Sequence, residues 1–274
     1  MLFRILLGSG IILFILIFLS IIMTLMVKGG SHITLELVTQ IPSDTFYNGG
    51  PGGILNAIAG SLLLAAGASV LASIWSVPIV LFLRLYLKTD SRTASLIRFV
   101  LDVLWGIPTI VYGAVSVIIL FGVKASLLTG IIIVGIIEIP VLTRTLDEVA
   151  RLLPVELIEA SYALGATRSQ TAFRVVLREL FPGFISAFLL AFGRGIGDAA
   201  AVLLVAGFSD SIPGSLFDQV ATLPVSIFFQ IQTPFPVVQE RAYATGFILM
   251  LIILVVSLLS RYFYNRFSRF QINR

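Results

Sequence analysis

The sequence predicts an all-α integral membrane protein with six transmembrane helices. Its 274 residues are 58% hydrophobic and only 12% charged, and their mean hydropathy is +1.07. Soluble domains carry roughly 25% charged residues, so most of this chain is expected to lie in lipid. A span needs about 20 apolar residues, and the windows that qualify cover about 5–27, 55–83, 99–121, 125–143, 181–208 and 243–260.

The first window is interpreted as a retained anchor helix. Only Arg4 precedes its long apolar stretch, and no small-residue cleavage site occurs before Lys28, which disfavours a cleaved signal peptide. The loop that follows contains the glycine-rich string NGGPGG at 48–53, which predicts a flexible connection to the second span.

The third to fifth windows contain residues that bend helices or carry charge. Pro108 predicts a kink in the third span, and Asp102 lies near the inner end of that span. Glu138 lies near the inner end of the fourth span, and the sequence leaves open whether Asp102 and Glu138 matter for function.

Basic residues predict the orientation of the spans. With the N-terminus inside, 14 of the 18 Lys and Arg residues fall on the inner side, as the positive-inside rule requires. Lys28, Lys124 and Arg241 fall outside, and Arg194 lies within the fifth span. Both termini are therefore expected to be cytoplasmic, and the net charge of +4 needs no nucleic-acid partner.

The polar segment of about 144–180, between the fourth and fifth spans, predicts two helices that meet at an elbow. Gly165 suits the left-handed position that ends a helix. Thr167 followed by Gln170 predicts a capping box that starts a second helix running toward Leu180. An exposed helix–glycine–helix elbow is suited to binding another protein.

The fifth span contains the pair of charges that most strongly suggests function. Arg194 and Asp198 are four residues apart, so on one helix they would share a face and pair. Buried charges in a membrane usually face a pathway or a bundle interior. The pair could therefore line a substrate pathway or could only hold helices together, and the sequence leaves both alternatives open. Gly193 and Gly197 form a G-x-x-x-G pattern, which predicts close packing of another helix.

Several kinds of chemistry find no support in the residues. The chain has no cysteine and one histidine, His32, so a metal site is not expected. No phosphate-binding G-x-x-x-x-G-K-[ST] loop and no hydrolytic motif occurs. The chain is therefore not expected to be an enzyme, and any ATP that drives it would be hydrolysed by another chain.

The elbow resembles the EAA loop of ABC-importer permeases. Glu159, Ala160 and Ser161 stand at the first triplet and Gly165 at the glycine, whereas Arg178 replaces the usual proline. Further stretches resemble the PstA family of phosphate-specific, MetI-like ABC transporter permeases: GIPTIVYG (106–113), EASYALGAT (159–167), GRGIGDAA (193–200) and LPVSIF (223–228). The family's usual R-A-I-G-E-T has Gly195 here in place of alanine and Asp198 in place of glutamate.

This resemblance implies a fold and a division of the chain. It implies a type I ABC importer permease core of five helices at 54–265, preceded by an anchor helix and external loop at 1–53 and followed by a cytoplasmic tail at 266–274. Glu159, Ala160, Gly165 and Ala166 would then couple the permease to an ATPase, and Arg194 with Asp198 would line the substrate pathway.

The resemblance also implies a substrate and partners. The substrate would be inorganic phosphate, which suits Arg194 because a guanidinium is a planar set of donors matched to an oxyanion. The partners would be a second, PstC-like permease, two PstB-like ATP-binding subunits that carry ATP and Mg, and an external PstS-like phosphate-binding protein. A sulfate or molybdate permease remains an alternative, as does a non-ABC channel or secondary transporter, although the latter would not need the elbow.

Overall fold

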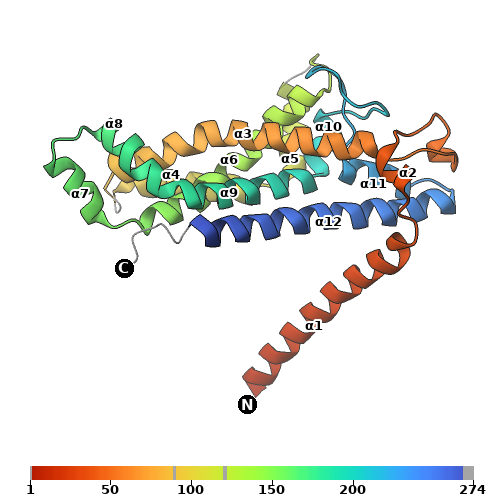
Figure 1. Ribbon diagram of the computed structural model, residues 1–274, viewed down its shortest axis with the longest axis horizontal. Coiled ribbons are helices and arrows are strands. Elements are labelled where there is room, and N and C mark those ends of the chain that lie inside the picture. The colour runs from red at the N-terminus through yellow and green to blue at the C-terminus, as the bar shows by residue number, and fades with distance from the viewer. Residues whose placement is uncertain (1, 89–90, 120–121, 268–274) are drawn as a thin grey trace.

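The computed structural model describes residues 2–88, 91–119 and 122–267, and the elements in these ranges are all helical (Figure 1). The predicted tail beyond residue 267 lies outside the described residues. Five helices are long and apolar enough to cross a membrane, and a bent pair makes a sixth candidate span. The predicted all-α membrane fold is therefore confirmed.

The long helices run side by side along the length of the molecule (Figure 1). They are α3 (Leu55–Leu85), α6 (Leu127–Arg151), α9 (Leu177–Gly197) and α12 (Pro236–Phe267). Short elements connect them: α2 (Leu35–Thr39), η2 (Phe46–Asn48), α7 (Val155–Ala163), α8 (Arg168–Thr171), η3 (Ala172–Val176), α10 (Ala200–Val205) and α11 (Leu223–Ile231).

The N-terminal helix α1 (Leu2–Thr24) diverges from this bundle (Figure 1). None of the residues in the most apolar window of this helix is buried by the rest of the chain. A π-helical turn, η1 (Leu25–Gly29), joins it to the bundle by packing against α12. An apolar helix without intramolecular cover suits a lipid-facing anchor, as the sequence predicts.

The third predicted span is broken rather than kinked. α4 (Arg92–Gly106) and α5 (Thr109–Ile119) meet at a bend of 92°. Ile107 has extended backbone angles, because Pro108 disfavours the helical region for the residue before it. The hydroxyl of Tyr112 donates to the carbonyl of Leu104 across this break at 2.8 Å, so the bend is held by a specific contact.

The predicted bounds of the fifth span, 181–208, are wrong at both ends. The helical segment begins at Arg168, so the second helix of the elbow is continuous with the membrane helix, and it stops at Gly197. Asp198 is extended, and its carboxylate accepts a hydrogen bond from the amide of Ala201 at 3.1 Å, which caps the separate helix α10.

The glycine-rich loop at 48–53 is held against the bundle by contacts with α12. The guanidinium of Arg241 on α12 donates to the carbonyl of Gly50 at 2.8 Å and lies over the ring of Phe46, which is fully buried. The loop thus forms a folded cap on the end of the bundle opposite the elbow (Figure 1).

Candidate functional site

The elbow between α7 and α8 has the local geometry that its sequence predicts. Gly165 adopts a left-handed conformation with φ +77°. The amide of Ala166 donates to the carbonyl of Ser161 at 3.1 Å, and that of Gly165 to the carbonyl of Tyr162 at 2.9 Å. These two bonds are the Schellman pattern, which satisfies the last carbonyls of a helix.

The second helix of the elbow starts with the predicted capping box. The amide of Gln170 donates to the hydroxyl of Thr167 at 3.3 Å, and the amide of Thr167 donates to the side-chain oxygen of Gln170 at 2.9 Å. The first helix ends at Gly165 and the second begins at Thr167. The angle between the two helices is therefore set by these few residues.

The elbow presents an exposed surface, and its two helices are joined to each other on the buried side. Glu159, Ala160 and Gly165 are exposed and Ala166 is half-buried, while Leu164 between them is 89% exposed. The hydroxyls of Ser161 and Thr171 form a hydrogen bond of 2.9 Å on the inner side, which holds α7 against the start of the second helix.

Two arginine contacts attach the elbow to α3. The guanidinium of Arg84 donates to the carbonyl of Leu153 at 2.7 Å, and that of Arg168 lies 5.2 Å from the ring centre of Tyr86. Residues 144–151 of the predicted elbow are the last two turns of α6, so the turn itself lies between Leu152 and Thr167. The elbow is therefore attached to the end of α3 by these contacts and follows directly on α6 along the chain.

An ion-pair network that the sequence analysis did not identify lies at the elbow end of the bundle. The side chain of Asp147 is 3% exposed, and its carboxylate contacts Arg98 at 2.7 Å, Arg151 at 3.3 Å and Arg144 at 3.9 Å. Arg144 also forms an ion pair with Asp102, at 2.7 Å. The network links α4 to α6. The sequence could have indicated the contacts within α6, because residues 144, 147 and 151 are spaced so that their side chains meet on one face of a helix. It could not indicate the partners on α4, which are distant in sequence.

Replacing Asp147 by asparagine is expected to destabilise the protein by roughly 3–5 kcal/mol, because several arginines lose a buried counter-charge. The thermal unfolding midpoint of the detergent-purified protein measures this. Asp102→Asn is the matched control, since the side chain of Asp102 is half-exposed and its ion pair in the described part of the chain is with Arg144. This variant should cost less than about 1 kcal/mol. Equal losses in the two variants would contradict the central role of Asp147.

Arg194 and Asp198 do not form the predicted helical pair. α9 ends between them, Asp198 caps α10, and none of the ion pairs found in the described ranges joins the two residues. Arg194 is half-buried and lines a cavity of about 400 Å³ between α9 and α12. The other lining residues are Leu189, Leu190, Gly193, Ile253, Val256, Ser257 and Ser260, so Arg194 is the charged member.

Gly193 and Gly197 face α12 without needing to be glycine. An added Cβ would lie 3.6 Å from Val256 at Gly193 and 3.9 Å from Ile253 at Gly197, both of which are ordinary contacts. The close approach that the sequence analysis assigned to these two positions occurs at Gly195 instead, where a Cβ would overlap the carboxylate of Glu138 on α6.

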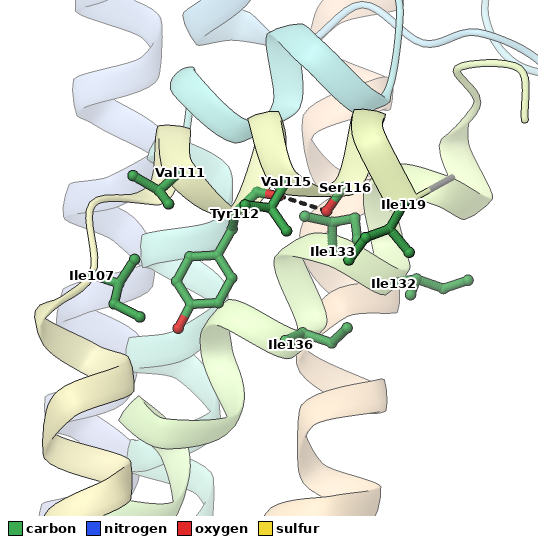
Figure 2. A pocket seen from close by; sticks show the side chains of 9 residues that line it. All are labelled: Ile107, Val111, Tyr112, Val115, Ser116, Ile119, Ile132, Ile133 and Ile136. Carbon is green, nitrogen blue, oxygen red and sulfur yellow. Dashed lines mark hydrogen bonds between the residues drawn. The ribbon is translucent and has the colours of Figure 1, made fainter. Parts of the chain in front are cut away.

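A second cavity, of about 420 Å³, lies between α5 and α6 (Figure 2). Its polar side chains are Tyr112 and Ser116, and the Ser116 hydroxyl bonds back to the carbonyl of Tyr112. The aliphatic lining residues are Ile107, Val111, Val115, Ile119, Ile132, Ile133 and Ile136. Because no cation lines it, this cavity does not suit an oxyanion, and the candidate anion site is the region around Arg194.

The residues that the structure describes contain no group of His, Cys, Asp and Glu side chains able to hold a metal ion. The features that remain are a membrane helix bundle, an exposed elbow joined to it by specific contacts, and a cation within the membrane segment. Together they define a multi-pass membrane protein with a surface suited to binding another protein.

This chain belongs to the family described as binding-protein-dependent transport system inner membrane component, which matches residues 76–269. It is similar to phosphate transport system permease proteins named PstA. The relative from Mycobacterium tuberculosis, PstA 1, is 33% identical over 76% of this chain and 69% of its own length. That from Yersinia pestis is 29% identical over 88% and 81%, and that from Xylella fastidiosa 31% over 87% and 83%.

Solved structures show the same fold. A chain of a bacterial alginate ABC transporter in complex with an alginate-bound periplasmic protein superimposes with a TM-score of 0.68, at 15% identity, over 99% of this chain and 96% of that one. A chain of the MetNI methionine ABC transporter gives a TM-score of 0.60 at 16% identity, over 80% and 96%. The fold is therefore that of a type I ABC importer permease.

Proposed function

We propose that this chain is the transmembrane permease subunit of an ATP-driven ABC importer for inorganic phosphate. The observation that carries the proposal is the elbow: a helix pair of defined angle, exposed at Glu159, Ala160 and Leu164, and continuous with membrane helix α9. A surface of this kind is suited to being moved by an ATPase and to passing that movement to the bundle.

The proposed roles follow from the positions of the residues. Glu159, Ala160, Gly165 and Ala166 contact the ATPase subunit, and Arg194 contacts the anion. Asp198 is proposed to line the same pathway, and its carboxylate also accepts a hydrogen bond from the amide of Ala201 in α10. Gly193 and Gly197 are proposed to be helix-packing positions, because both face α12. The chain is also proposed to divide into an anchor helix with an external loop at 1–53, a permease core at 54–265 and a cytoplasmic tail at 266–274.

The partners are proposed from the resemblance to the PstA family. They are a second, related permease of the PstC type, two ATP-binding subunits of the PstB type and an external phosphate-binding protein of the PstS type. ATP and Mg would be bound by the ATPase subunits and not by this chain, which is proposed to be non-catalytic. The protein would lie in the cell membrane with both termini cytoplasmic, as the basic residues favour.

Phosphate is supported over other oxyanions by the three relatives named as phosphate permeases. Arg194 supports the class of anion rather than phosphate itself, because a guanidinium binds any tetrahedral oxyanion. The assembled transporter in proteoliposomes should therefore show ATP hydrolysis that rises when phosphate-loaded binding protein is added. Stimulation by a sulfate- or molybdate-loaded binding protein instead would contradict the substrate. Failure of any ATPase to co-purify with the chain would contradict the transporter class.

A further inference from the structure

The cavity beside Arg194 contains two hydroxyl groups to which the proposed function assigns no role. Its volume is about 400 Å³, and its lining comes from α9 and α12. Apart from Arg194, the polar side chains of this lining are Ser257 and Ser260, both on α12. They are three residues apart, so they share one face of that helix. An anion that enters the cavity therefore meets a guanidinium from one helix and hydroxyls from the other.

Ser257 lies at the level of Arg194. The helices α9 and α12 run side by side (Figure 1), and a Cβ at Gly193 would lie 3.6 Å from Val256, in ordinary contact. Arg194 follows Gly193 on α9, and Ser257 follows Val256 on α12. Because one residue advances an α-helix by about 1.5 Å, the two side chains are attached at nearly the same height, and both line one cavity.

The hydroxyl of Ser257 is free to bind a ligand. Serines in membrane helices commonly bond to a carbonyl of their own helix, as Ser73 on α3 does to Ser69 at 2.7 Å. Ser257 has no hydrogen bond in the described part of the chain. The hydroxyl of Ser260 donates to the carbonyl of Ser186 on α9 at 3.4 Å, which leaves its oxygen able to accept. A hydroxyl without a partner in an apolar environment is costly, and a polar ligand would supply the partner.

The guanidinium and the hydroxyls have complementary hydrogen-bonding roles. A guanidinium donates but does not accept, whereas a hydroxyl does both. Phosphate near neutral pH keeps at least one P–OH group, and leaving that donor unpaired in a desolvated site is costly. Ser257 and Ser260 are the lining side chains that can accept its hydrogen bond. Sulfate carries no proton at that pH and needs no acceptor.

We propose that Ser257 and Ser260 form the α12 half of the anion site: they contact the phosphate that Arg194 binds, and their oxygens accept the hydrogen bond from its P–OH group. The inference rests on the proposed function, in which Arg194 meets the anion, and it extends the site to a second helix. Ser257 contacts the phosphate at the level of Arg194. Ser260, which lies nearly one turn closer to the elbow, contacts the phosphate as it moves inward.

The test measures phosphate uptake per ATP hydrolysed by the complete transporter in proteoliposomes, with phosphate-loaded binding protein in excess. Ser257→Val and Ser257→Thr are a matched pair, because their side chains have the same shape and differ by the hydroxyl. We expect uptake per ATP to fall at least about fivefold in Ser257→Val, since the P–OH group is left unpaired. Ser257→Thr should fall less. Equal values in the two variants, or a wild-type value in Ser257→Val, would overturn the proposal.

Ser73→Ala is the control for the loss of a serine from a membrane helix. Ser73 is half-buried, bonds within its own helix and lies outside the cavity lining. Its loss should keep uptake per ATP within about twofold of wild type. If Ser257 only packs α12, Ser257→Val would lower ATP hydrolysis and uptake together and leave their ratio unchanged, which would also overturn the proposal. If Ser257→Val fails to assemble, the smaller Ser257→Ala takes its place in the comparison with Ser257→Thr.

The acceptor role is tested by displacing radiolabelled phosphate from the detergent-purified transporter without the binding protein. Unlabelled phosphate and sulfate are compared as displacing anions in Ser257→Thr and Ser257→Val. Loss of the hydroxyl should raise the half-displacing concentration of phosphate by a larger factor than that of sulfate, because sulfate has no proton to be left unpaired. The same factor for both anions would overturn the acceptor role.

Arg194→Gln, measured in parallel, separates this inference from the proposed function. Retained uptake in Arg194→Gln would remove the anion site itself and the serine contacts with it. Lost uptake in Arg194→Gln together with wild-type uptake per ATP in Ser257→Val would overturn the serine contacts alone.

Discussion

Replacing Arg194 by alanine is expected to abolish phosphate uptake while the complex still assembles. Truncating one partner of a buried, hydrogen-bonded charge pair costs roughly 2–5 kcal/mol, which is a factor of about 30 or more in affinity for the anion. Radiolabelled phosphate uptake into proteoliposomes, with co-purification of the subunits as the measure of assembly, tests both parts of the prediction.

Three further variants refine the role of Arg194. Arg194→Lys should be impaired, because an ammonium lacks the paired donors of a guanidinium. Asp198→Asn should retain partial uptake, because asparagine can still accept the hydrogen bond from Ala201 that caps α10. Near-normal uptake in the double variant Arg194→Gln with Asp198→Asn would contradict the anion site and leave both charges as structural.

Replacing Gly165 by valine is expected to uncouple ATP hydrolysis from transport while the protein inserts and assembles normally. The backbone at Gly165 has φ +77°, and a Cβ placed there would meet nothing within 4 Å. The effect is therefore one of backbone conformation and not of a steric clash with a neighbour. A left-handed conformation costs an L-residue roughly 1–2 kcal/mol, and more for a β-branched one, so the joint between α7 and α8 would straighten or loosen.

The measurement is ATPase activity, with and without phosphate-loaded binding protein, alongside uptake. Gly165→Val should lose both the stimulation of ATP hydrolysis by phosphate-loaded binding protein and the uptake of phosphate. Gly165→Asn is the matched control, because asparagine tolerates the left-handed region, and it should keep most of the activity. Normal transport by the valine variant would remove the mechanical argument for the elbow.

The elbow could be predicted from the sequence because its determinants are local. The left-handed Gly165, the Schellman bonds and the Thr167–Gln170 box each involve residues no more than five positions apart. Backbone preferences and capping act over this range whatever the rest of the chain does. The same holds for the apolar spans, whose number follows from length and composition.

The expected pairing of Arg194 with Asp198 was wrong because it assumed that the apolar run from 181 to 208 is one helix. The spacing argument holds only inside a helix, and α9 stops at Gly197. Asp198 followed by three alanines could have been read as the cap of a new helix, but hydropathy does not change there, so the window gave no sign of the break.

The sequence by itself determined the class of the protein, the number of spans, the basic bias between the two sides and the elbow, since each depends on composition or on neighbours along the chain. Only the tertiary structure decided what surrounds the charges. Arg98 meets Asp147 from 49 positions away, and Glu138 rests against Gly195 on another helix. Such contacts depend on how helices approach one another across long sequence separations. The hydrophobic pattern, which is nearly uniform around a membrane helix, does not specify that approach.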